Sequence, residues 1–216
     1  RDDCPGADLT TEGLGLARVP ARARLSARAA MVACGVEEAA RMFELAGAAA
    51  SRVVRSGEAV TAGAVLVEAN GTAGALHRTY RMAQTVIEML SGMASAARAI
   101  VEAARGVNPA CRVACTRKHM PGMKRWALRA IEAGGAEPHR LGLSDSLLVF
   151  DSHRVLLDPV RPLAEHFARL KASVPGQRLA AEGASLAEAL ALAAAGAGLV
   201  QVDKLAPAQV AAVARA

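Results

Sequence analysis

The chain has 216 residues, and 53% of them are hydrophobic, which is enough to form the core of one large domain or two modest ones. Its formal net charge of +6 is compatible with either a nucleic acid or an anionic small ligand as a partner. Only 2% of the residues are aromatic, too few for a base-stacking surface, and the basic residues are dispersed, so the composition favours a compact anionic ligand.

The first half of the chain predicts a mixed segment followed by a long helical one. Apolar residues recur at helical spacing from Val36 to Gly47, and the glycine can end the helix. Residues 53–67 are interrupted by glycines and predict short strands and turns. Residues 75–105 predict one long helix or two abutting helices, with Ser91-Gly92 as either a kink or a point of close packing. One apolar stripe follows this segment: Ala83, Ile87, Leu90, Ala94, Ala97 and Val101.

Strand and helix patterns alternate in the second half of the chain. The predicted strands are residues 112–115, 147–150, 179–181 and 199–202. The predicted helices are residues 123–133, 162–174, 185–196 and a last one that begins at Pro207. Ser185 and Glu188 match a capping box, in which the serine accepts from the Glu188 amide while the glutamate side chain reaches back. Four successive βα units predict a parallel sheet, which either stays open or continues beyond Ala216, because four units do not close a barrel of eight.

Cysteine usage and hydropathy exclude several other classes of protein. Among four cysteines, only Cys111 and Cys115 lie close together, without partners at the spacing of a zinc site, so we interpret all four as free thiols or small buried residues. The sequence contains neither a recognisable signal peptide nor an unbroken apolar run, and we expect a soluble cytoplasmic protein. Because the chain starts inside an acidic segment, Arg1-Asp2-Asp3, we also expect a short segment to precede it.

Polar side chains follow each of the four predicted strands. In strand order they are Thr116, Arg117, Lys118 and His119, then Asp151, Ser152 and His153, then Glu182, and last Asp203 and Lys204. Ligand sites in parallel α/β folds lie at the carboxyl ends of the strands. Strand ends are polar in any such protein, but the repetition over four strands favours a site at this edge.

The charges of these residues suit a phosphorylated substrate with magnesium. Arg117, Lys118 and Arg140 supply cationic donors for carboxylate or phosphate groups. Glu182 and Asp203 supply the hard oxygen ligands that Mg²⁺ prefers. The alternative for each residue is a structural salt bridge with a neighbour.

Four motifs resemble those of the quinolinate phosphoribosyltransferase family. They are Asp8-Leu9-Thr10-Thr11, the run LSGMAS at 90–95, the run TRKHMPG at 116–122, and Gly134-Gly135 followed by HRLGL at 139–143. Their order and spacing agree with the family from residue 8 to about residue 205.

The resemblance implies an α/β fold made of an N-terminal α/β sandwich domain plus an open (incomplete) TIM-like α/β barrel. On this basis we expect the sandwich domain at residues 1–75, connecting helices at 76–105 and the barrel at 106–216. The resemblance also implies a homodimer or higher oligomer with shared active sites. From composition and hydropathy we expect neither a nucleic acid nor a membrane as a partner.

The resemblance further implies a reaction. The family transfers phosphoribosyl from phosphoribosyl pyrophosphate to quinolinate and gives nicotinate mononucleotide, CO₂ and pyrophosphate, with Mg²⁺ as cofactor. The residues it assigns to substrate binding are Arg117, His139, Arg140 and an arginine donated by the partner subunit, which matches Arg81. We add Lys204 to the predicted substrate-binding residues from its spacing alone. The predicted catalytic residues are Lys118, Glu182 and Asp203, and the last two are also the predicted metal ligands.

Two segments depart from the family pattern. Where the family carries KDNH, the chain reads Phe150-Asp151-Ser152-His153, so an aromatic ring replaces a cation that would touch a substrate carboxylate. Where the family carries DN after a later strand, the chain has Asp203-Lys204, and Lys204 could restore the positive charge. Both changes resemble the ModD subgroup, which is named for molybdate transport.

These departures leave two interpretations open. The first is a magnesium-dependent phosphoribosyltransferase that acts on quinolinate or a related heterocyclic acid. The alternative is a non-catalytic anion-binding or regulatory protein of a molybdate transport system, because the same cations could bind an oxyanion such as molybdate. A nucleic-acid binder, supported by net charge alone, comes third.

Overall fold

The computed structural model describes residues 3–216, so Arg1 and Asp2 of the acidic start lie outside it. The chain separates into two compact units, which divide between His139 and Arg140, and each is described here by itself. The domain boundaries expected from the sequence, at residues 75 and 105, stay predictions.

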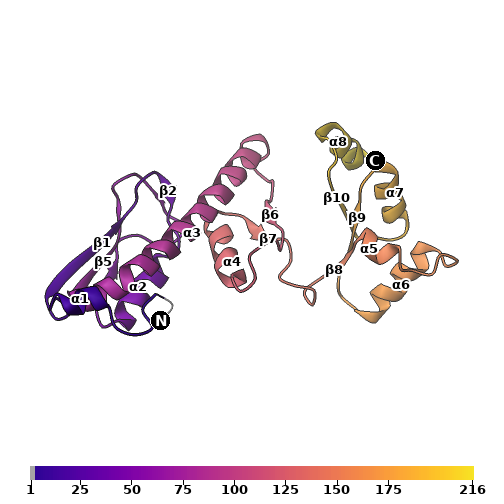
Figure 1. The fold of residues 1–216 in the computed structure, drawn as a ribbon. Helices are drawn as coiled ribbons and strands as arrows, with labels where there is room; N and C mark the ends of the chain where they lie inside the picture. Colours follow the sequence, from indigo (N-terminus) through magenta and orange to yellow (C-terminus); the bar gives the residue numbers. More distant parts are fainter. Residues whose placement is uncertain (1–2) are drawn as a thin grey trace. The chain divides into compact units, whose positions relative to one another are not determined.

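Unit 1 is built on an antiparallel sheet with the strand order β1-β5-β3, and Figure 1 labels two of these strands, β1 and β5. Its strands are β1 (Pro20–Ser26), β3 (Ala49–Arg52) and β5 (Val65–Thr72), and a separate pair is formed by β2 (Met31–Val32) and β4 (Ala59–Val60). Alternate residues of β1 face the core, and the arginines between them, Arg22 and Arg24, both pair with Glu68 of β5, at 2.7 and 2.8 Å. This alternation buries one face of the sheet only.

Between residues 3 and 139, four helices accompany the strands of unit 1. They are α1 (Leu9–Gly13), α2 (Val36–Leu45), α3 (Ala73–Val107) and α4 (Lys124–Ala133). The helix predicted from Val36 is confirmed, and Gly47 follows it in a left-handed conformation at φ +92°. Both α2 and α3 pack against the sheet, and the largest side chain of this core, Phe43, is fully buried.

The long helix α3 is continuous over 35 residues (Figure 1). All six residues of the predicted apolar stripe are buried. Ser91-Gly92 does not break the helix. Instead Ser91 is buried, and its hydroxyl accepts from the amide of Cys34 at 2.9 Å and donates to the carbonyl of Cys34 at 3.2 Å. Of the two interpretations of Ser91-Gly92, the structure therefore supports the close packing point.

The predicted single parallel sheet is wrong in one respect, because the parallel strands of the described chain form two sheets. Strand β6 (Ala114–Cys115) pairs in unit 1 with β7 (Glu137–Pro138), which the sequence did not predict. Strand β7 has two residues and no apolar run, so its pairing depends on backbone bonds, such as that from the amide of His139 to the carbonyl of Cys115 at 2.9 Å. The strand expected at residues 112–115 is correspondingly shorter.

Unit 2 contains a three-stranded parallel sheet with the order β10-β9-β8. Its elements are β8 (Leu147–Val149), α5 (Asp151–Arg154), α6 (Leu163–Ser173), β9 (Leu179–Gly183), α7 (Leu186–Ala194), β10 (Leu199–Val202) and α8 (Pro207–Arg215). Phe167 of α6 and Leu192 of α7 pack with Val149, Ala181 and Val200 on one face of this sheet. The predicted strands and helices of this region are confirmed within a few residues, and the described sheet is open rather than closed into a barrel.

The predicted capping box at α7 is half correct. The hydroxyl of Ser185 accepts from the amide of Glu188 at 3.1 Å, as expected. The carboxylate of Glu188 accepts from the amide of Ala184 at 2.7 Å, one residue before the expected one. Over residues 3–216, no helix is long and apolar enough to cross a membrane.

Candidate functional site

The first group of predicted site residues lies at the carboxyl edge of the β6–β7 sheet in unit 1. Cys115 pairs with Pro138, so Thr116 and His139 follow directly after neighbouring parallel strands. Arg117 and Lys118 come next along the chain, and the side chains of Arg117, Lys118 and His139 are all exposed. The structure thus places two cations and an imidazole on one loop edge, where they can reach an anionic ligand.

The second group lies at the carboxyl edge of the sheet in unit 2. Gln201 of β10 is in register with Glu182 of β9, and its side-chain amide donates to the Glu182 carboxylate at 2.6 Å. Asp203 follows β10, and its amide donates to the carbonyl of Gly183 at 3.3 Å. The two predicted acids therefore end adjacent strands. Gln201, which orients Glu182, was not among the predicted site residues. It lies two residues before Asp203, and residues at this spacing lie on the same face of a strand, so the sequence did contain a sign of its position.

Lys204 adopts a left-handed backbone conformation, with φ at +58°. Its ammonium lies 3.4 Å from the Asp203 carboxylate, and its side chain is 89% exposed. A residue with a β-carbon rarely adopts this conformation. The substrate-binding role predicted for Lys204 stays a prediction. The ion pair between Lys204 and Asp203 is a salt bridge of the kind named as the alternative to that role.

Arg140, Phe150 and His153 form a stack at the start of α5 in unit 2. The Arg140 guanidinium carbon lies 5.6 Å from the centroid of the Phe150 ring, and Arg140 is only 6% exposed. The rings of Phe150 and His153 are 5.7 Å apart and inclined by 20°. The Phe150 amide donates to Nδ1 of His153 at 3.0 Å. The sequence identified Arg140 and Phe150 separately, but their contact and the part played by His153 emerge only in three dimensions.

Arg81 lies on α3 in unit 1 and lines a cavity of about 530 Å³. Its guanidinium lies 5.7 Å from the ring centroid of Tyr80, which in turn makes an edge contact with His77. Asp8 lies on the same cavity, and hydrogen bonds from the hydroxyl and amide of Thr11 lower the pKa of its carboxyl. The cavity therefore combines cations with a carboxylate that stays ionised.

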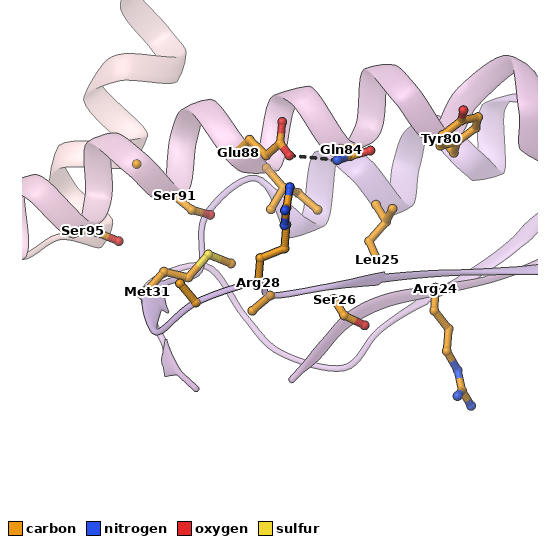
Figure 2. Close-up of a pocket in the computed structure, with 14 residues that line it drawn as sticks. Arg24, Leu25, Ser26, Arg28, Met31, Tyr80, Gln84, Glu88, Ser91 and Ser95 are labelled. Atoms are coloured by element: carbon orange, nitrogen blue, oxygen red, sulfur yellow. Dashed lines mark hydrogen bonds between the residues drawn. The ribbon is translucent and has the colours of Figure 1, made fainter. Parts of the chain in front are cut away.

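A further cavity of about 490 Å³ lies between β1 and α3 in unit 1, and no predicted site residue lines it (Figure 2). Gln84 donates to Glu88 at 2.8 Å along one wall, and Arg28 extends from the opposite loop toward that wall (Figure 2). Most of its lining is apolar or small, and sequence reasoning gave no signal for it because its walls are brought together only by packing of the helix on the strand.

The predicted magnesium ligands can be tested on the chemistry of the donors. Glu182 and Asp203 contribute carboxylates from adjacent strand ends. The Glu182 carboxylate accepts a hydrogen bond from Gln201, and the Asp203 carboxylate forms an ion pair with Lys204. Among residues 3–216, no group of three or more histidine, cysteine, aspartate or glutamate side chains is arranged to hold a metal. A pair of carboxylates suits Mg²⁺, which keeps several waters and takes its remaining ligands from a phosphorylated substrate. The carboxylates of Glu182 and Asp203 therefore have the chemistry that a magnesium ion requires.

Comparison with known families covers almost the whole chain. The N-terminal domain of quinolinate phosphoribosyl transferase matches residues 8–91, and the C-terminal domain of the same enzyme family matches residues 93–216. The ModD protein of Rhodobacter capsulatus, whose name classes it among the pyrophosphorylases, is 48% identical over 99% of this chain and 82% of its own length. A protein of Archaeoglobus fulgidus, named as a carboxylating nicotinate-nucleotide pyrophosphorylase, is 32% identical over 83% of this chain and 68% of its own length.

Solved structures agree on the fold. NadC from Streptococcus pyogenes superposes with a TM-score of 0.89 at 27% identity, over 100% of this chain and 75% of that one. The nicotinate-nucleotide pyrophosphorylase from Francisella tularensis has a TM-score of 0.87 at 21% identity, over 99% of this chain and 74% of that one. At 21% identity, the Francisella tularensis structure supports the fold alone. The Streptococcus pyogenes structure is similar in fold and has the higher sequence identity of the two, 27%.

Proposed function

The chain belongs to the quinolinate phosphoribosyltransferase family, and we propose that it transfers phosphoribosyl from phosphoribosyl pyrophosphate to quinolinate or a related heterocyclic acid. With quinolinate the products would be nicotinate mononucleotide, CO₂ and pyrophosphate. The observation that carries the proposal is the placement of Glu182 and Asp203 at adjacent strand ends in the same unit as the buried Arg140.

Each charged residue has a role in this proposal that its chemistry supports. Arg117, His139 and Arg140 bind and orient the acid through hydrogen bonds to its carboxylate. Lys118 faces the anionic groups of the substrates. Glu182, oriented by the side-chain amide of Gln201, holds the ribose and stabilises the positive charge that develops on it as the bond to pyrophosphate breaks.

Glu182 and Asp203 would hold Mg²⁺ in this arrangement. The bound ion would neutralise the negative charge of the departing pyrophosphate. The pairing of Lys204 with Asp203 keeps a positive charge beside this carboxylate before the substrates bind.

We also propose that the active site is shared between two subunits, with Arg81 contributed by the second copy. Arg81 is exposed on α3 and lies beside Tyr80 on the surface cavity that also contains Asp8, so its guanidinium is available to an anion from another chain.

A second candidate is a non-catalytic anion-binding or regulatory protein of a molybdate transport system. The observation in its favour is Phe150, since the guanidinium of Arg140 lies against an aromatic ring rather than beside another cation. The identity to the ModD protein of Rhodobacter capsulatus supports both candidates equally.

One experiment separates the two candidates. The full-length protein is incubated with quinolinate, phosphoribosyl pyrophosphate and Mg²⁺, and both nicotinate mononucleotide and pyrophosphate are measured. The enzyme hypothesis expects both products, and expects their loss in a Glu182→Gln, Asp203→Asn variant but not in the control Glu165→Gln, which alters an exposed acid on α6. If phosphoribosyl pyrophosphate does not bind and none of a panel of heterocyclic acids reacts, the enzyme hypothesis is wrong.

A further inference from the structure

Lys204 has an unusual backbone conformation directly after β10. Among residues 3–216 it is the one residue other than glycine with a positive φ, at +58°. Residues with a β-carbon rarely adopt this conformation, and such strain is concentrated at functional sites. Neighbouring side chains point to opposite sides of an extended strand, and the bend at Lys204 lets its ammonium approach the Asp203 carboxylate, at 3.4 Å. The chain therefore places a cation against the preceding carboxylate at the edge of the sheet.

The two acids proposed as magnesium ligands have partners of different kinds. The Glu182 carboxylate accepts at 2.6 Å from the side-chain amide of Gln201, which the register of β9 and β10 holds beside it, and both residues are partly buried. The side chains of Asp203 and Lys204 are 49% and 89% exposed. An ion pair this exposed contributes little stability and is screened by other ions. Asp203 is therefore the acid whose partner can be replaced.

Charge decides when that replacement is favourable. The ammonium of Lys204 neutralises Asp203, so it weakens the attraction of this carboxylate for a second cation. A divalent cation held by Glu182 and Asp203 beside Lys204 would leave an excess of positive charge, which opposes binding of the metal alone. The phosphate groups of phosphoribosyl pyrophosphate would attract both cations, and a lysine ammonium is a common phosphate ligand. Metal and substrate should therefore bind more tightly together than separately.

We propose that Lys204 is the counter-cation of Asp203 in the free protein and moves to a phosphate of phosphoribosyl pyrophosphate when the divalent cation binds. The inference rests on the proposed function and adds that the substrate and the metal bind cooperatively. The flexible stem of a lysine permits this exchange without a change of the backbone. Lys204 thus makes the affinity of the acid pair for metal depend on the phosphate groups of the substrate.

The test measures metal binding to the full-length protein with and without phosphoribosyl pyrophosphate. Mn²⁺ serves as the probe, because carboxylate and water ligands suit it as they suit Mg²⁺, and the paramagnetic resonance signal of the free ion gives the unbound concentration. Lys204→Met keeps the β-carbon and a similar stem but removes the charge. We expect it to raise the affinity for Mn²⁺ alone by about three- to tenfold. The factor by which phosphoribosyl pyrophosphate raises this affinity should fall by about tenfold.

Two further variants separate the charge of Lys204 from other effects. Lys204→Arg keeps the charge and should behave like the wild type. Arg169→Met removes a positive charge from the exposed surface of α6, in the same unit, and should leave both affinities unchanged. Complexes of Mn²⁺ with the substrate in solution are the same for every variant, so the comparison between proteins removes their contribution.

Binding of phosphoribosyl pyrophosphate, measured by calorimetry, distinguishes failure of this inference from failure of the proposed function. If the substrate binds but Lys204→Met has the same two Mn²⁺ affinities as the wild type, the inference is overturned while the proposed function stands. The same conclusion follows if the wild-type protein binds Mn²⁺ equally well with and without the substrate, or does not bind it. If phosphoribosyl pyrophosphate does not bind, the proposed function fails and the inference fails with it.

Discussion

Substitution of Ser91 tests how much the hydrogen bonds between α3 and the backbone of Cys34 stabilise unit 1. Its hydroxyl accepts from the amide of Cys34 and donates to the carbonyl of the same residue, and the two residues are 2% and 0% exposed. In Ser91→Ala both backbone groups lose this partner inside a packed region. One buried donor without a partner costs about 1–3 kcal/mol in the free energy of unfolding, and we expect a loss in that range.

Ser95 provides the matched control. Its hydroxyl accepts from the amide of Val32 at 2.9 Å, one helical turn further along α3, but Ser95 is only half-buried. Water can replace this hydroxyl, so Ser95→Ala should cost about 1 kcal/mol or less. The difference between the two variants isolates the cost of burial, because both remove a serine that binds the same segment.

Trp126 offers the assay. It is the single tryptophan of the chain, and it packs in the cluster that contains Cys34 and Leu90. Its fluorescence during urea unfolding therefore reports on this region of unit 1. A cost below about 0.5 kcal/mol for Ser91→Ala, or equal costs for the two serine variants, would refute the reasoning, because surface substitutions have effects of that size.

Three other perturbations have definite expected outcomes. Gly134→Ala should destabilise unit 1 by about 1–3 kcal/mol in urea unfolding, since its β-carbon would lie 2.5 Å from a carbonyl of α3, whereas Gly92→Ala meets nothing within 4 Å and should be neutral or stabilising by up to about 1 kcal/mol. Burial raises the pKa of Glu37, but hydrogen bonds and a nearby arginine outweigh it and bring the pKa below its ordinary value of 4.5, so the stability it contributes is present above pH 4.5 and lost as the pH falls through the folded-state pKa. Glu37→Gln should flatten this acid limb of the unfolding free energy, and an unchanged limb would assign it to other groups. If the active site is shared, mixing inactive Arg81→Ala and Arg117→Ala chains should restore part of the phosphoribosyltransferase activity, and no rescue in proven mixed dimers would argue against sharing.

Local periodicity explains which parts of the fold could be predicted from the sequence. The stripe through Ala83 and Val101 predicted α3 because a helix of this length repeats its core-facing position many times. Strand β7 has two residues and gives no periodic signal, so it was missed, and the parallel strands were assigned to one sheet instead of two. Its pairing depends on contacts with β6, which lies more than twenty residues earlier in the chain.

In the candidate site as well, the sequence predicted the features that follow from chain order and missed those that depend on contacts between distant residues. Chain order placed Glu182 and Asp203 at strand ends, because a strand followed by a helix leaves its carboxyl end at one edge of the sheet. The order could not show that Arg140 lies on the Phe150 ring, ten residues away, since that contact depends on how the intervening loop folds. The pairing of Glu182 with Gln201 similarly required the register of two strands separated by a helix.

Because α3 is continuous, residues cannot be inserted into it or deleted from it without disturbing the packing of its buried side chains. The boundary between the two matched family domains, at residues 91 and 93, falls inside this helix. Its buried side chains belong to successive clusters, with Ile87 in one, Leu90 and Ala94 together in a second that spans the boundary, and Val101 in a third. One residue inserted near Gly92 would rotate everything after it by about 100°, so the part of the buried stripe on one side of the insertion would turn toward water. Insertions and deletions should therefore be tolerated in the loops, whereas the number of residues in α3 should stay constant.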